Sequence, residues 1–143
     1  MYVKQISIFV ENRKGRLEDV CGYLDENEIN IISIILADTN EYGLIRMIVS
    51  DADKAKNVLK AAGFSTIITD VIAVKFPHTA GTLKNLLELF AEEELNVEYM
   101  YGLSTTKEAA VIVFKTSDND KALAAISNKG GEYGIEAIDE SMI

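Results

Sequence analysis

The sequence predicts an α+β protein made of two tandem βαββαβ sandwiches with antiparallel sheets. Three observations support this fold class: an internal repeat at a spacing of 66 to 67 residues, amphipathic helical stripes at matched places in both copies, and strands of alternating Ile and Val. Such strands suit an antiparallel sheet that packs one face on helices. We expect the first domain in residues 1–69 and the second in 70–143, with no linker between them.

The first repeat supplies apolar residues at i, i+3, i+4 and i+7, which predict an amphipathic helix: Leu17, Val20, Cys21 and Leu24. A second helix is expected to start at Ser50 as the N-cap, with an acid at its third position, and to end at Gly63 as a left-handed residue. The expected strands are 2–10, 30–38, 44–50 and 64–69, and the expected helices are 16–27 and 51–62.

The second repeat has the same signals, with Ser117 as the expected N-cap and Gly130 as the expected left-handed end of the last helix. The spacing grows by one residue along the repeat, which predicts an insertion in a hairpin near 39–42 or 104–108. The resulting element order is that of the split-βαβ, ferredoxin-like sandwich. The expected strands are 71–76, 96–104, 109–116 and 135–139, and the expected helices are 82–93 and 118–129.

A glycine loop joins the first strand to the first helix in both repeats. It reads Glu11-Asn12-Arg13-Lys14-Gly15-Arg16-Leu17 in one and Pro77-His78-Thr79-Ala80-Gly81-Thr82-Leu83 in the other, and Asn30-Ile31 or Asn96-Val97 follows at the next strand. This pattern resembles the ACT domain over essentially the whole chain. The first loop is especially similar to those of serine-regulated phosphoglycerate dehydrogenases. The family often has Pro before the glycine, whereas this chain has Lys14 and Ala80.

The chemistry of the loop suits a free α-amino acid. Unpaired N–H groups at a helix N-terminus bind a carboxylate, and glycine allows a close backbone approach. An asparagine can accept from an ammonium group or donate to a carboxylate. The resemblance implies a regulatory protein, not an enzyme, that binds an amino-acid effector at an interface of ACT domains. The expected ligand-binding residues are Asn12, Arg13, Lys14, Gly15, Arg16, Leu17, Asn30, Ile31, His78, Thr79, Ala80, Gly81, Thr82, Leu83, Asn96 and Val97.

Several function classes are disfavoured by composition. A net charge of −9 disfavours nucleic acid, and no apolar run approaches a membrane span. One cysteine, Cys21, excludes an internal disulfide and favours a cytoplasmic location. We expect no metal and no cofactor beyond the amino-acid effector. The expected partners are a second copy and an enzyme or regulator of amino-acid metabolism.

Alternative interpretations stay open at this point. The two repeated asparagines are also common at strand starts, and His78 is also typical of a solvated loop. The ACT units could serve oligomerisation alone, without a ligand. A small ferredoxin-like enzyme is the third hypothesis, but no nucleophile with a matching base is found in the sequence.

Overall fold

The computed structural model describes residues 1–38 and 42–143 of the chain. The chain divides into two compact units, which are described separately. We call Lys4–Asp70 the first unit, and Val71–Ile143 together with Met1–Val3 the second unit. Both units mix helices with an antiparallel sheet, which confirms the predicted α+β fold class.

The first unit follows the predicted order of strand, helix, two strands, helix and strand. Its elements are β1 (Val3–Glu11), α1 (Arg16–Glu26), β2 (Ile31–Asp38), β3 (Tyr42–Val49), α2 (Ala52–Ala61) and the first part of β4 (Ser65–Pro77). The second unit repeats the order, beginning with the remainder of β4. Its further elements are α3 (Thr82–Glu92), β5 (Val97–Thr105), β6 (Ala109–Thr116), α4 (Asn119–Lys129), the 3-10 turn η1 (Gly130–Tyr133), β7 (Glu136–Ile138) and the 3-10 turn η2 (Glu140–Met142).

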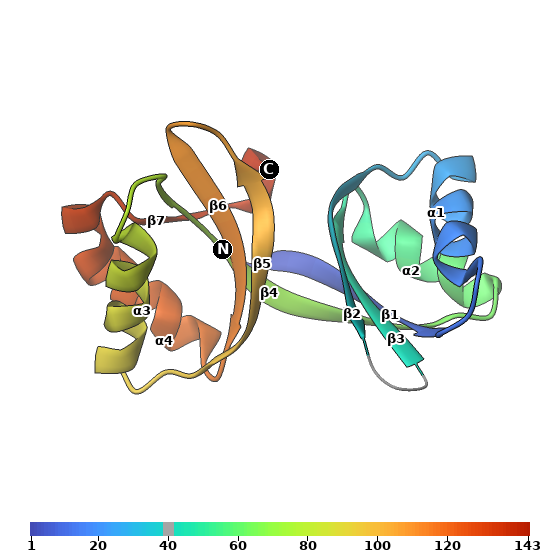
Figure 1. Cartoon of the computed structure of the whole chain (residues 1–143), viewed down its shortest axis with the longest axis horizontal. Coiled ribbons are helices and arrows are strands. Elements are labelled where there is room, and N and C mark those ends of the chain that lie inside the picture. The colour runs from blue at the N-terminus through green and yellow to red at the C-terminus, as the bar shows by residue number, and fades with distance from the viewer. Residues whose placement is uncertain (39–41) are drawn as a thin grey trace. The chain divides into compact units, whose positions relative to one another are not determined.

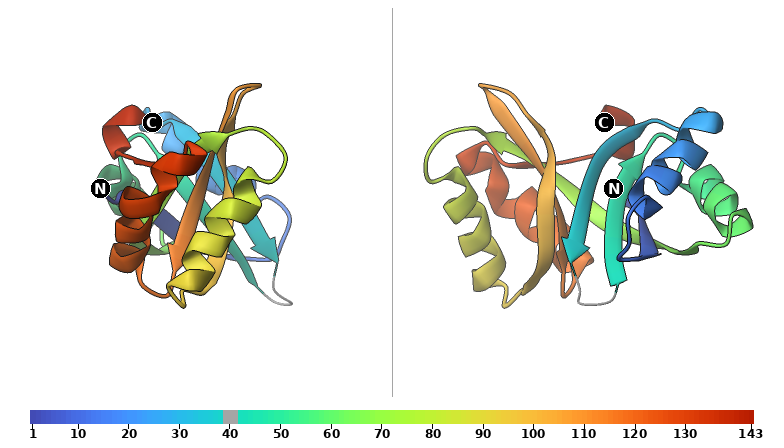
Figure 2. Two further views of the ribbon diagram at one scale, coloured as in Figure 1. Left: turned by 90° about the vertical axis from the view of Figure 1, so that its left-hand side faces the viewer. Right: turned by 45° about the vertical axis from the view of Figure 1, so that its right-hand side comes forward.

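The strand order is the same in both units. It is β2-β3-β1-β4 in the first and β5-β6-β4-β7 in the second. In each unit two helices cover one face of the sheet (Figure 1), and α3 and α4 lie side by side (Figure 2). Buried apolar side chains fill the space between helices and sheet, including Ile8, Leu24 and Met47 in the first unit and Leu86, Phe90 and Phe114 in the second. None of the helices in the described parts of the chain is long and apolar enough to cross a membrane.

The serines predicted to cap the second helix of each unit have another role. Asp51 and Asp118 are the N-caps, and their carboxylates accept hydrogen bonds from the backbone N–H groups of Lys54 and Lys121. The preceding Ser50 and Ser117 accept instead from the backbone at the start of the neighbouring strand. The sequence prediction was therefore wrong by one residue, because aspartate directly after serine competes for the capping position.

The extra residue of the second repeat lies within a strand rather than in a hairpin. Gly102 pairs with Ile112, but Ser104 pairs with Val111, so Leu103 is bulged out of β5. The strands on either side of this bulge keep the register of the first unit. The predicted range 104–108 misses the insertion by one residue, and most of the alternative range, 39–42, lies outside the described residues.

The end of α4 also differs from the prediction. Gly63 is left-handed, with φ 92°, but Gly130 is helical, with φ −65° and ψ −31°. The chain continues into η1, and the left-handed residue is Gly134, with φ 70°. Gly130 is needed for a close approach, because a Cβ there would lie 2.7 Å from the carbonyl oxygen of Ile135.

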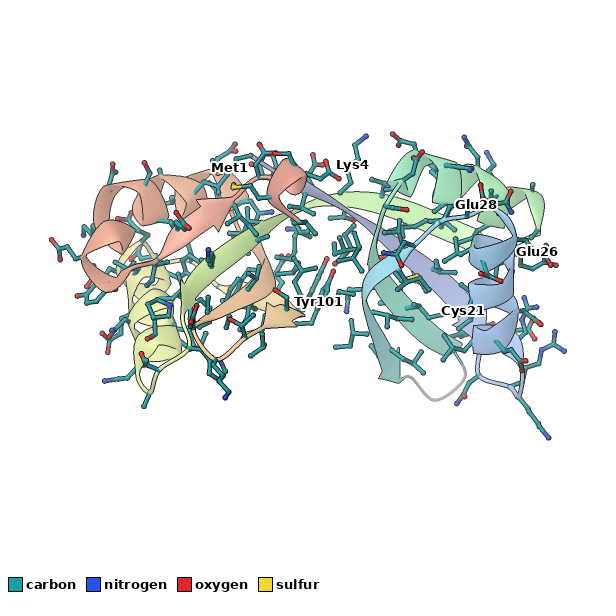
Figure 3. All side chains as sticks on the ribbon, turned by 90° about the horizontal axis from the view of Figure 1, so that it is seen from above. Met1, Lys4, Cys21, Glu26, Glu28 and Tyr101 are labelled. Atoms are coloured by element: carbon teal, nitrogen blue, oxygen red, sulfur yellow. The ribbon has the colours of Figure 1, made fainter. Side chains whose placement is uncertain are left out.

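One glutamate with a strained backbone conformation follows the first helix of each unit. Glu28 and Glu94 have φ 56° and 57°, in the left-handed region that non-glycine residues rarely adopt. Figure 3 shows Glu28 just beyond the last turn of α1. The N–H of the residue after each glutamate donates to a carbonyl five residues earlier, at 2.9 Å in both units. These bonds close each helix with a left-handed C-cap.

Candidate functional site

The two glycine loops have the same backbone conformation. Gly15 has φ 87° and ψ −10°, and Gly81 has φ 90° and ψ −14°. A matching turn precedes each glycine, because the N–H groups of Arg13 and Thr79 donate to the carbonyl two residues earlier, at 2.8 and 2.9 Å. The loops of the two units therefore differ in their side chains and not in their path.

A cavity of about 470 Å³ lies beside the second loop. This volume falls in the range of small-molecule sites, about 300–1,000 Å³. Ten residues from β4, the loop, α3, β5 and β6 line it: Phe76, His78, Thr79, Ala80, Gly81, Leu83, Gly102, Thr105, Ala110 and Ile112. Five of these were predicted from the sequence, so the structure brings most of the second loop to one cavity.

Local hydrogen bonds hold the second loop in place. The N–H of His78 donates to the carbonyl of Glu108 at 3.1 Å, which ties the loop to the β5–β6 hairpin. The hydroxyls of Thr79 and Thr82 are 2.9 Å apart and bond to each other. Thr82 is buried and does not line the cavity, and its hydroxyl helps to position Thr79.

The start of α3 presents backbone N–H groups without a capping side chain. The first backbone hydrogen bond of the helix runs from the N–H of Asn85 to the carbonyl of Gly81, at 3.0 Å. Gly81 is the N-cap and supplies no side chain to Leu83 or Lys84. These amides carry the positive end of the helix dipole. Among the described residues that line the cavity, none is Asp, Glu, Lys or Arg.

The first loop is arranged differently around its side chains. Asn12 lines a cavity of about 290 Å³ together with Leu36, Ala37 and Gly43. Arg13 turns outward to form an ion pair with Glu11, at 3.0 Å, and both side chains are exposed. Lys14 is exposed as well.

The other predicted residues of the first loop lie on α1 or beside it. Gly15 lines a separate groove along α1, beside four acidic or aromatic residues of that helix. The guanidinium of Arg16 lies 4.4 Å from the ring centre of Phe64 and pairs with Asp19 at 3.3 Å. Leu17 is exposed on the surface of α1. Arg16 is thus held by the scaffold.

The repeated asparagines lie away from the loops within their own units. The N–H of Asn30 donates to Ser50 Oγ at 2.9 Å, and the N–H of Asn96 donates to Ser117 Oγ at 3.0 Å. Ile31 pairs with the last residue of β3, Val49, whereas the glycine loop lies beyond the opposite end of the sheet. At ~3.3 Å per residue, the length of β2 separates the two features by roughly 23 Å. An asparagine and a glycine loop of one unit therefore do not line one cavity.

The residues after these asparagines belong to the core. Ile31 and Val97 are partly buried and pack against the apolar clusters of their units. The sequence interpretation missed the strand residues that complete the cavity: Phe76, Gly102, Thr105, Ala110 and Ile112. The available signal was Gly102, because a glycine inside a strand often marks a bulge or a close approach by a ligand or another backbone. Within the described residues, no cluster of His, Cys, Asp and Glu suits a metal ion.

Comparisons with known proteins identify relatives of the chain. A family model described as an ACT domain pair matches residues 1–141. The crystal structure of protein BT0572 from Bacteroides thetaiotaomicron is 34% identical, with a TM-score of 0.91, and the match covers 99% of this chain and 94% of that one. No curated protein matches.

Two more distant structures share the fold. The ligand-free regulatory subunit of aspartate kinase from Thermus thermophilus is 18% identical, with a TM-score of 0.62 over 87% of this chain and 91% of that chain. Aspartate kinase from Synechocystis is also 18% identical, with a TM-score of 0.63 over 91% of this chain and 25% of that chain.

Proposed function

Because the chain belongs to the family of ACT domain pairs, we propose that it is a regulatory protein that binds a free α-amino acid in the cavity beside Gly81. The observation that carries this proposal is the cavity of about 470 Å³ at the start of α3. It is lined by Gly81 and Leu83 at the start of α3, where no side chain caps the helix, and no Asp, Glu, Lys or Arg is among the described lining residues. A zwitterion of zero net charge suits such a site.

The α-carboxylate of the ligand would be bound by the N-terminus of α3. The backbone N–H groups of Leu83 and Lys84 are not capped by a side chain of the N-cap residue, Gly81. A carboxylate there accepts hydrogen bonds and interacts favourably with the helix dipole, by roughly 0.3–1 kcal/mol for an exposed group. Lysine or arginine is not needed for this interaction.

The ammonium group would be held by neutral acceptors around the cavity. Thr79 and Thr105 supply hydroxyl oxygens, and His78 supplies a ring nitrogen when it is neutral. Several weak acceptors give modest affinity. We expect a dissociation constant between about 1 µM and 1 mM, which corresponds to about 4–8 kcal/mol.

Regulation requires that the ligand bind two states of the protein with different affinity. The two states would differ in self-association or in binding to an enzyme of amino-acid metabolism. The fold shared with the regulatory subunit of aspartate kinase supports this kind of partner. The chain itself would act without catalysis, with the amino acid as an effector.

Isothermal titration calorimetry with each of the twenty L-amino acids tests the proposal. We expect at least one to bind at or below millimolar concentration and His78→Ala to weaken it. Asn12→Ala is the matched control, because Asn12 occupies the same place in the first loop and should leave this affinity unchanged. If no amino acid binds at 10 mM, about tenfold above the weakest expected constant, the proposal is wrong.

A second candidate function is self-association without a ligand. It is favoured by exposed apolar side chains on α1 and the edge strand β2, namely Leu17, Ile34 and Leu36. Light scattering coupled to size exclusion separates the two functions. A dimer that is unchanged by every amino acid and is lost on Ile34→Lys supports this alternative.

A further inference from the structure

We infer that Gly102 admits the side chain of the ligand into the cavity of the second unit, and that this side chain is apolar. The inference rests on the proposed function and specifies which amino acids that site selects. It also assigns one ligand to each chain, because the first unit has a leucine where the second has Gly102.

Gly102 is required neither by a left-handed backbone nor by a clash that a Cβ would make. Its φ lies outside the left-handed region, unlike that of Gly15, Gly63, Gly81 and Gly134. A Cβ built on Gly102 meets no heavy atom within 4 Å. A glycine inside a strand lowers stability through its backbone freedom. The open space above Gly102 is therefore a feature that the fold itself does not need.

The β-bulge that follows Gly102 does not explain the glycine either. The register of β5 shifts between Gly102 and Ser104, but a similar shift between Ile31 and Ser33 in β2 is made without glycine. Bulges with a left-handed glycine need that residue type. Gly102 does not have such a φ.

The first unit shows what another residue does at the same place. Gly102 pairs with Ile112 as Leu36 pairs with Ile45, so the two positions correspond. The Leu36 Cδ1 lies 3.3 Å from where a Cβ on Gly43 would be. The leucine side chain therefore lies over the floor of the sheet, where it lines the smaller cavity, of about 290 Å³, of the first unit.

The walls around that space select an apolar group. Phe76, Leu83, Ala110 and Ile112 contribute carbon atoms on the helix-facing side of the sheet. A charged ligand side chain would lose water there without an oppositely charged partner among the described lining residues. With the α-carboxylate at the start of α3, an apolar side chain can extend over Gly102.

The test is calorimetric titration of the full chain with L-valine, L-leucine and L-phenylalanine as apolar probes and with L-aspartate and L-lysine as charged probes. We expect one apolar ligand per chain and no binding of the charged probes. Gly102→Ala should weaken L-leucine or L-phenylalanine at least about 10-fold more than L-valine, because one methyl group in a pocket discriminates by about that factor. Gly102→Leu should abolish binding, and Leu36→Ala, the matched change in the first unit, should not alter it.

Three results overturn the inference. Unchanged affinity and preference in Gly102→Ala exclude a role in selection, and this variant decides the question if Gly102→Leu fails to fold by circular dichroism. Binding of a charged amino acid in place of the apolar ones excludes the apolar class and leaves the proposed function standing. If none of the twenty amino acids binds the native chain, the proposed function itself is wrong and the inference is lost with it.

Discussion

Replacing either left-handed glutamate by glycine should stabilise the protein. Glu28 and Glu94 have φ 56° and 57° at the ends of α1 and α3. An L-residue in this conformation costs about 1–2 kcal/mol, whereas glycine adopts it without a Cβ clash. The same conformation in both units shows that the fold imposes it.

The expected gain in the free energy of unfolding is smaller than the cost of the left-handed conformation. Glycine adds backbone freedom to the unfolded chain, which lowers the free energy of unfolding by about 0.4–1 kcal/mol. The difference leaves about 0.5–1 kcal/mol in favour of glycine at each position. For a chain of this size, the melting temperature should rise by about 2–4 °C for each kcal/mol.

Thermal and urea unfolding of Glu28→Gly and Glu94→Gly measures this gain. Glu93→Gly is the matched control, because Glu93 has φ −90° and also lies at the end of α3. This control removes the same charge and adds the same backbone freedom without relieving a left-handed residue, so it should lower stability by about 0.4–1 kcal/mol. If Glu94→Gly lowers the melting temperature as much as Glu93→Gly, the backbone account is refuted.

Five other substitutions have predicted outcomes. Gly130→Ala should lower the free energy of unfolding by about 1–3 kcal/mol, because the added Cβ would lie 2.7 Å from the carbonyl oxygen of Ile135. Gly131→Ala is the control, since its Cβ would meet no atom within 4 Å, and it should change the free energy of unfolding by less than about 0.5 kcal/mol. Ser117→Ala removes an acceptor for the backbone N–H at the start of β5 and should cost about 0.5–1 kcal/mol in urea unfolding. Gly15→Ala and Gly81→Ala should each cost about 1–2 kcal/mol, because both glycines are left-handed, but only Gly81→Ala should weaken amino-acid binding in calorimetry; equal weakening would contradict a single site in the second unit.

The fold could be predicted from the sequence because its signals are local and are present twice. The helical stripe from Leu17 to Leu24 and the glycine loop each depend on residues close in the chain. The errors arose where two local signals compete. Asp51, which follows Ser50, is the N-cap of α2. Gly130 has the residue type expected at a helix end, but the chain continues as a 3-10 turn to the left-handed Gly134. Neighbouring residue types alone do not rank such alternatives.

For the cavity beside Gly81, the sequence could predict only the lining residues that are neighbours in the chain. Residues 78–81 and Leu83 line the cavity as one group because a loop and a helix start are adjacent in the chain. Gly102 and Ile112 were missed because their place beside the loop depends on the pairing of β5 with β6. Asn30 and Asn96 lie away from the glycine loop of their own unit, because each stands at the start of a strand that runs parallel to the strand leading into the loop.

The duplication provides an internal comparison for this site. Where both units need a feature for folding, they share it, as the φ values of Gly15 and Gly81 and of Glu28 and Glu94 show. A difference between corresponding positions then has three physical sources: local packing, an interface with a second copy, or a ligand. At Gly102 an added Cβ would have no heavy atom within 4 Å and the φ lies outside the left-handed region, so neither a clash with a Cβ nor the backbone explains the glycine. This difference supports the inferred ligand, which would contact the second unit and not the first.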